Sequence, residues 1–106
     1  MKTLKFKSHL VKLIKEGKKT STWRLFDEKN LAVDDEVALY EEGIEKSFAI
    51  ATLTHVTEKT LGSLTDADWI GHERFTSTED MYATYRSYYG PNVSEDTTVK
   101  IITFSI

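Results

Sequence analysis

The segment from Gly17 to Arg24, Gly-Lys-Lys-Thr-Ser-Thr-Trp-Arg, holds the side chains best suited to bind a polar ligand. Its ammonium, hydroxyl and guanidinium groups are donors of the kind that hold phosphates and carbonyl oxygens. Thr20, Thr22 and Arg24 share one face of a predicted strand, because side chains alternate along a strand. The segment therefore predicts a ligand site, although a surface strand with threonines for β-propensity and an arginine for solubility has the same pattern.

The positive charge of the chain is concentrated around this segment. Residues 1–24 carry eight lysines and arginines against one acid, and the other 82 residues carry six against sixteen, so a charge of +7 is followed by one of −10. The net charge of −3 argues against a protein that coats nucleic acid non-specifically. The asymmetry predicts an electropositive face, which is either a solvated lysine-rich helix or an anion site for a phosphate or nucleotide backbone.

The elements that must position these groups follow the order β-α-β-β-β-α-α-β. Strands are predicted over 4–6, 20–26, 36–40, 47–56 and 97–106, with a bulge near Ala51 where the apolar parity slips. Helices are predicted from a Ser8 cap to Gly17, over 61–72 with Thr65 as cap, and from a Thr76-x-x-Glu79 capping box to Gly90-Pro91.

The short connections favour an α+β fold with an antiparallel, barrel-like sheet and helices over its open sides, because parallel crossovers need longer links. The chain shows no linker or repeat, so residues 1–106 are expected to form one domain. Alternating patterns predict one core that contains Trp23, Leu25, Val37, Leu39, Phe48, Ile50, Ile101 and Phe104.

The composition removes several classes of chemistry. The chain has no cysteine, which excludes disulfides, cysteine-ligated metals and thiol nucleophiles and fits a reducing, cytoplasmic compartment. Its three histidines are scattered without companion acids at ligand spacing, so no metal site and no cofactor are expected. No apolar run approaches the roughly 18 residues of a membrane span, and the lysine-rich N-terminus lacks the features of a secretory signal, so no membrane partner is expected.

Gly17, Lys19, Thr22 and Arg24 fit the pattern G-x-K-x-x-T-x-R, which resembles that of ASCH domains (activating signal cointegrator homology) in the PUA-like superfamily. A later Asp-Asp-Glu-Val turn at 34–37 stands where these domains usually carry Gly-Asp. The resemblance covers essentially the whole chain and is to single-domain prokaryotic members. It implies a PUA-like antiparallel β-barrel with flanking helices.

The resemblance also implies a function, which is binding of RNA or of a nucleotide-like ligand in a basic cleft built on this segment. The residues expected to contact the ligand are Lys18, Thr20, Arg24 and Tyr82. Tyr82 belongs to a group of helix tyrosines that either stack on bases or form an amphipathic core. A small ribonuclease is a further alternative for a basic cleft lined with hydroxyl groups.

Some single-domain bacterial members resemble amidohydrolases that act on N4-acetylcytidine, with a lysine, a threonine and a glutamate as reactive groups. The matching positions here are Lys19, Thr22 and Glu73, and a shift of one residue would bring His72 to the acid position. A threonine hydroxyl needs a base to become a nucleophile, and a lysine is that base only when its pKa is lowered. Whether the protein is an enzyme depends on whether these three side chains converge in one pocket.

Overall fold

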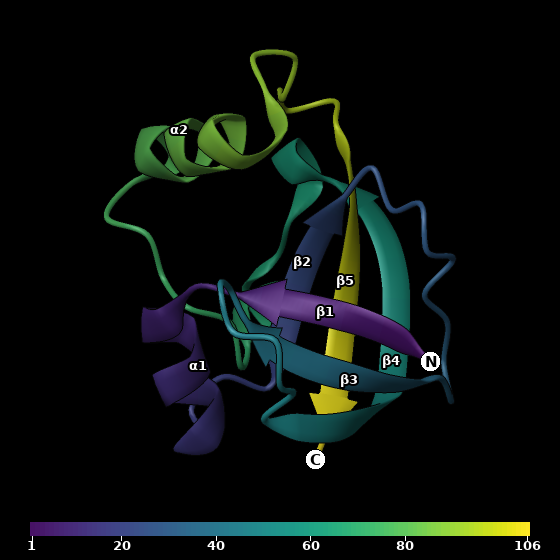
Figure 1. Ribbon diagram of the computed structural model, residues 1–106. Coiled ribbons are helices and arrows are strands. Elements are labelled where there is room, and N and C mark those ends of the chain that lie inside the picture. The colour runs from purple at the N-terminus through teal and green to yellow at the C-terminus, as the bar shows by residue number, and fades with distance from the viewer.

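The protein folds as a strongly curved five-stranded sheet with two α-helices, described over residues 1–106 by a computed structural model (Figure 1). The sheet order is β1-β3-β4-β5-β2. Its strands are β1 (Lys2–Phe6), β2 (Ser21–Leu25), β3 (Glu36–Glu41), β4 (Ala49–Thr60) and β5 (Thr98–Ser105). The helices are α1 (Ser8–Lys15) and α2 (Thr78–Tyr89), with short 3-10 turns at Leu61–Ser63 and Asp66–Trp69. This confirms the predicted α+β class.

The predicted antiparallel β-barrel is wrong in two respects. β1 and β2 stand at opposite ends of the sheet order and do not pair, so the sheet stays open. β1 also runs parallel to its neighbour β3, while the other three strand pairs are antiparallel. The parallel pair is possible because α1 and β2 lie between β1 and β3 in the sequence and supply the long crossover that it needs.

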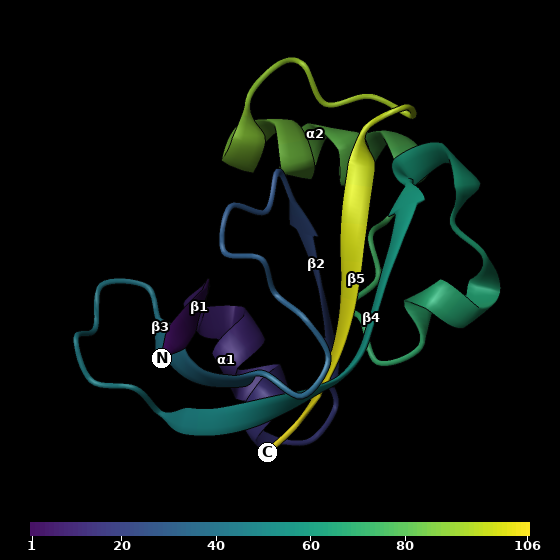
Figure 2. The same cartoon turned by 90° about the vertical axis from the view of Figure 1, so that its right-hand side faces the viewer.

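Two apolar clusters, rather than the single predicted core, stabilise the sheet. One lies against α1 and includes Val37, Leu39 and Phe104, and the other lies beneath α2 and includes Trp23 and Ile101. Figure 2 shows α2 across one end of the sheet and α1 near the other. β5 contributes to both clusters because its successive side chains point to opposite faces and both faces are covered.

Local details of β4 differ from the sequence prediction. Ile50 is 54% exposed instead of buried, and Phe48 is only partly buried at the margin of the α1 cluster. Ala51 and Leu53 point inward and Ile50 points outward, so the apolar parity is regular up to Leu53. The register shift then falls between Leu53 and His55, further along the strand than the bulge expected near Ala51.

The helix boundaries also correct three predictions. Lys7, not Ser8, is the N-cap of α1, and it makes no side-chain cap. The cap of α2 is Ser77, whose side chain accepts a hydrogen bond from the backbone N–H of Asp80, so the expected Thr76–Glu79 box does not form. The segment 61–72 forms two 3-10 turns instead of one helix, because Leu64 and Thr65 are extended between them, although Thr65 does cap the second.

Candidate functional site

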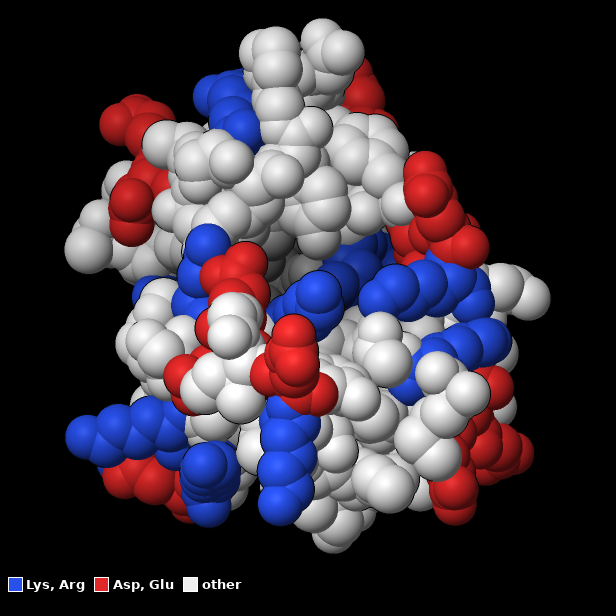
Figure 3. Space-filling model, in the orientation of Figure 1, with Lys and Arg blue, Asp and Glu red and all other residues white.

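A cleft of about 390 Å³ lies between β1, β2 and α2. Residues from seven segments line it: β1, α1 with its N-cap, the loop before β2, β2, the turn after β3, the connector before α2, and α2. In Figure 3 the hollow lies below the α2 layer, with Lys and Arg side chains along its lower border. The lining residues with polar or charged side chains are Lys5, Lys7, Lys19, Thr22, Arg24, Glu42, His72, Glu73, Ser87 and three tyrosines of α2.

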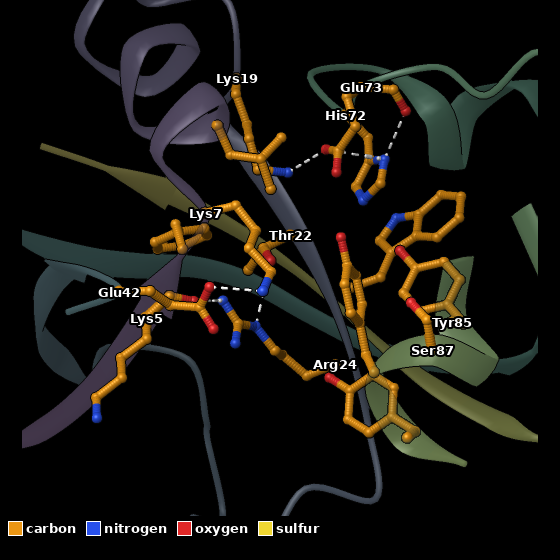
Figure 4. A pocket seen from close by; sticks show the side chains of 15 residues that line it. Lys5, Lys7, Lys19, Thr22, Arg24, Glu42, His72, Glu73, Tyr85 and Ser87 are labelled. Atoms are coloured by element: carbon orange, nitrogen blue, oxygen red, sulfur yellow. Dashed lines mark hydrogen bonds and ion pairs between the residues drawn. The ribbon is translucent and has the colours of Figure 1, made fainter. Parts of the chain in front are cut away.

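Lys19 lies in the wall of this cleft and is only 2% exposed. The chain leaves α1 at Gly17, whose φ of +77° suits glycine, and so Lys19 is free of the strand alternation that begins at Ser21. Its Nζ donates a hydrogen bond to the backbone oxygen of Ser21 at 2.7 Å and another to the carboxylate of Glu73. A loop lysine and a distant acid are thereby joined (Figure 4).

Gly71 explains how Glu73 reaches Lys19. The backbone oxygen of Gly71 accepts hydrogen bonds from the N–H groups of Thr20 at 2.8 Å and Ser21 at 3.1 Å, which fastens the connector to the start of β2. Gly71 has a φ of +76°, and a Cβ there would lie 2.1 Å from the Thr20 hydroxyl. Glycine therefore suits this contact, since another residue would be strained at this φ and would displace the Thr20 hydroxyl, and the contact places the next two residues at the cleft.

Thr22 and Arg24 share the face of β2 that looks into the cleft, as alternation predicts. Thr22 is 4% exposed, and its Oγ1 accepts a hydrogen bond from Nε of Arg24 at 3.3 Å. The Arg24 guanidinium lies over the ring of Phe6 and donates from Nη2 to the backbone oxygen of Lys5 at 3.0 Å. Arg24 thus spans the gap between the two unpaired strand ends.

His72 lies beside Glu73 and is almost fully enclosed. Its ring stacks on Trp23 with centroids 3.9 Å apart, and its Nδ1 lies 2.8 Å from the backbone oxygen of Glu73. Burial, assisted by the charge of Lys19, lowers the pKa of His72 to about 4. The side chain is therefore neutral near pH 7. Both residues that competed for the acid position in the sequence line the cleft, and Glu73 is the one that contacts Lys19.

Burial also governs the Lys19–Glu73 pair. It lowers the pKa of Lys19, an effect that the neighbouring Glu73 carboxylate partly opposes and the charge of Arg24 reinforces. For Glu73, burial opposes ionisation, but the neighbouring His72 and Lys19 outweigh it and hold the pKa below its usual value. The lysine is therefore easier to deprotonate than a surface lysine, while the glutamate stays ionised.

Three of the residues predicted to bind ligand do not line this cleft. Lys18 is exposed, and its Nζ lies 3.9 Å from a carboxylate oxygen of Glu16. Thr20 is also exposed, at the contact with Gly71. Tyr82 lies in a separate groove, because α2 turns it away from the cleft that Tyr85 lines. The fold brings together Lys19, Thr22, Arg24 and Glu73.

The sequence prediction missed the contribution of β1. Lys5 and Lys7 line the cleft, as does Glu42, which forms an ion pair with Lys7 at 2.7 Å. The alternation of these two lysines was visible in the sequence, but only the parallel pairing of β1 with β3 brings them opposite β2.

No helix has both the length and the apolar character of a membrane span, and no cluster of three or more metal-ligating side chains is present.

Comparisons with known proteins support the fold. No protein-family model matches the sequence, and no curated protein matches it. Protein EF3133 from Enterococcus faecalis V583, of family DUF984, matches with a TM-score of 0.75 and 16% identity over 92% of this chain and 69% of its own. The ASCH domain from Lactobacillus crispatus JV V101 matches with a TM-score of 0.67 and 17% identity, over 89% and 67%. The hypothetical protein PH0355 matches with a TM-score of 0.74 and 20% identity, over 99% and 98%. The chain therefore has the fold of ASCH domains, as its motif predicted.

Proposed function

We propose that the protein hydrolyses the amide bond of an N-acylated pyrimidine nucleoside of the N4-acetylcytidine type. The observation that carries this proposal is the convergence of Lys19, Thr22 and Glu73 in one cleft, with Lys19 and Glu73 in contact. The acylated cytidine comes from the resemblance of the motif to that of ASCH domains with such activity. An enzyme of this kind needs these three side chains in one pocket, whereas a binding module does not.

The dimensions and walls of the cleft agree with a nucleoside-sized substrate. Its volume of about 390 Å³ lies at the lower end of the range for small-molecule sites and suits a single nucleoside better than an oligonucleotide. Trp23, Tyr85 and Tyr89 supply flat apolar surfaces in the same walls. Such surfaces favour a planar base.

The proposed chemistry uses Thr22 as the nucleophile and Lys19 as the base. Neutral Lys19 takes the hydroxyl proton as Oγ1 attacks the acyl carbonyl, and the carbon–nitrogen bond then breaks as the lysine returns this proton to the leaving amino group. Water attacks the resulting threonine ester as its proton passes to Lys19, and Lys19 then gives this proton to Oγ1 as the ester bond breaks, which releases the carboxylic acid and restores the hydroxyl and the neutral lysine. Glu73 holds the lysine in place, and the hydrogen bond from Arg24 to Oγ1 stabilises the oxygen as it loses its proton.

The test is incubation of the protein with N4-acetylcytidine and, separately, with short RNAs, while deacetylation and strand cleavage are both followed. We expect release of cytidine and acetate, loss of turnover in Thr22→Ala with binding retained, and residual turnover in Thr22→Ser. The control is Thr52→Ala, because Thr52 is exposed on β4 away from the cleft. Wild-type turnover in Thr22→Ala would contradict the proposal, and strand cleavage without deacetylation would favour the ribonuclease alternative.

Binding of RNA is the second candidate, and the border of the cleft favours it. Lys5, Lys7 and Arg24 lie there with Tyr88, a residue that is 47% exposed. Cations beside an exposed aromatic ring suit a phosphate backbone with an unstacked base. An RNA ligand predicts an affinity that falls steeply with salt and weakens in Lys7→Ala but not in Lys12→Ala, a matched loss of charge on the exposed side of α1. Equal effects of the two variants would argue against this candidate.

A further inference from the structure

His72 is held in one orientation at the wall of the cleft. Its side chain is 1% exposed, its ring stacks on Trp23 with an interplanar angle of 19°, and the Trp69 ring meets it edge-on at 5.9 Å between centroids. These contacts fix the plane of the ring. The hydrogen-bond contact of Nδ1 with the Glu73 backbone oxygen sets the directions of the two nitrogens.

The contacts of Nδ1 determine which nitrogen carries the proton. Nδ1 lies 2.8 Å from the backbone oxygen of Glu73, and a carboxylate oxygen of the same residue lies 3.3 Å away. Both oxygens are acceptors, so in the neutral ring Nδ1 is the donor. The lone pair consequently resides on Nε2.

Nε2 has no hydrogen-bond partner within the protein, and the ring lies in the wall of the cleft. Its ring makes a hydrogen bond only through Nδ1. The only fully buried side-chain nitrogen or oxygen without a partner is Nε1 of Trp23, so the unbonded Nε2 of His72 is not fully buried. In Figure 4 this nitrogen points away from Glu73 toward the interior of the pocket. An acceptor in such a place needs a donor from a ligand or water.

The other acceptors of the cleft bear on which group of a ligand would bind to Nε2. Its two carboxylates are already engaged, Glu73 with Lys19 and Glu42 with Lys7. The carbonyl of an acylated cytosine can take a donor from the cleft, and its single amide N–H needs an acceptor, which Nε2 of His72 can supply.

We propose that Nε2 of His72 accepts a hydrogen bond from the N4–H of the acylated cytosine, which makes His72 the residue that selects secondary amides. The proposal rests on the function proposed above. His72 acts as an acceptor and not as a proton-transferring base, because a group whose pKa is about 4 is a weak base near neutral pH. Lys19 keeps the role of base.

The test compares N4-acetylcytidine with N4-acetyl-N4-methylcytidine, which lacks the N–H, on wild type, His72→Phe and His72→Gln. Phenylalanine keeps a ring stacked on Trp23 but offers no acceptor, whereas glutamine offers a carbonyl oxygen. We expect the wild type to prefer the secondary amide in kcat/KM by about tenfold to a hundredfold, since an acceptor left unpaired by the methylated substrate is costly. The preference should fall to about twofold or less in His72→Phe and return in part in His72→Gln.

The outcomes separate this proposal from the proposed function. Hydrolysis by the wild type without discrimination overturns the role of His72 alone, as does an equal loss on both substrates in His72→Phe, which indicates a structural role. If the wild type binds but does not hydrolyse, the same comparison of affinities by tryptophan fluorescence decides the matter. Binding of neither nucleoside overturns both proposals. Long-range proton–nitrogen NMR of the wild type provides a readout without variants: Nε2 should be unprotonated and should shift when N4-acetylcytidine binds, and a protonated Nε2 contradicts the proposal.

Discussion

Protonation of His72 should destabilise the protein at mildly acidic pH. Its pKa is about 4 in the folded chain, against 6.5 for an ordinary histidine, mainly because of burial and then because of the charge of Lys19. Between these two values the unfolded chain binds a proton at this site and the folded chain does not. The contribution of neutral His72 to the free energy of unfolding is therefore fully present above pH 6.5. It decreases as the pH falls toward 4 and changes no further below that value.

The size of the effect follows from the shift. A displacement from 6.5 to about 4 corresponds to about 3 kcal/mol over the whole window, of which about 2 kcal/mol is lost between pH 7 and pH 4.5. The carboxylates whose pKa is lowered, such as Glu73 and Asp27, lose their stabilising contribution at more acidic pH, because their ordinary values lie near 4. The interval above pH 4.5 consequently reports mainly on His72.

The assay is urea unfolding followed by tryptophan fluorescence at pH 7.0 and 4.5. Each protein is compared with itself at the two pH values, so that any cost of the substitution at pH 7 cancels. We expect the wild type to lose about 2 kcal/mol, His72→Phe to lose much less, and His55→Phe, a control at an exposed position of β4, to behave as the wild type. An equal loss in the wild type and in His72→Phe would refute the reasoning, because it would mean that His72 is not the group that titrates.

Three further substitutions test the site and its support. Lys19→Arg should be inactive because a guanidinium cannot act as a base, and wild-type turnover should rise with pH as Lys19 loses its proton; initial rates across pH 6 to 10 check both. Gly71→Ala should lower kcat, because its Cβ would collide with Thr20 and move Glu73, and wild-type kinetics would contradict the role of this turn. Trp23→Ala should cost about 3 to 5 kcal/mol of stability in urea unfolding, since the ring is buried in the cluster beneath α2, and a loss below 1 kcal/mol would contradict that burial.

The sequence predicted those features of the fold that depend on neighbouring residues. The turn at Gly17, the alternation of Thr22 and Arg24 on β2, and the presence of five strands and a helix ending at Gly90 are all decided within a few residues. Local pattern also sufficed to place Trp23 in an apolar cluster. The resemblance of the motif to that of ASCH domains also predicted the fold, which matches that of a solved ASCH domain.

The errors arise where distant segments decide the outcome. The parallel pairing of β1 with β3 leaves no local trace, and without it the sheet was expected to close. The parity of β4 was misread because Ile50 is as apolar as the residues that point inward. Tyr82 and Tyr85 are chemically alike and three positions apart, so only the packing of α2 decides which of them lines the cleft.

The failure of the sheet to close is what creates the candidate site. In a closed barrel the free edges of β1 and β2 would pair through their backbones and leave no room between them. Here the exposed carbonyls of β1 are instead satisfied by long cationic side chains, with Arg24 donating to Lys5 at 3.0 Å and Lys29 donating to Thr3 at 2.5 Å. These side chains hold the edges apart while supplying the hydrogen bonds that the strands lack. Arg24 thereby connects architecture to chemistry, because its Nη2 spans the opening while its Nε contacts the hydroxyl of Thr22.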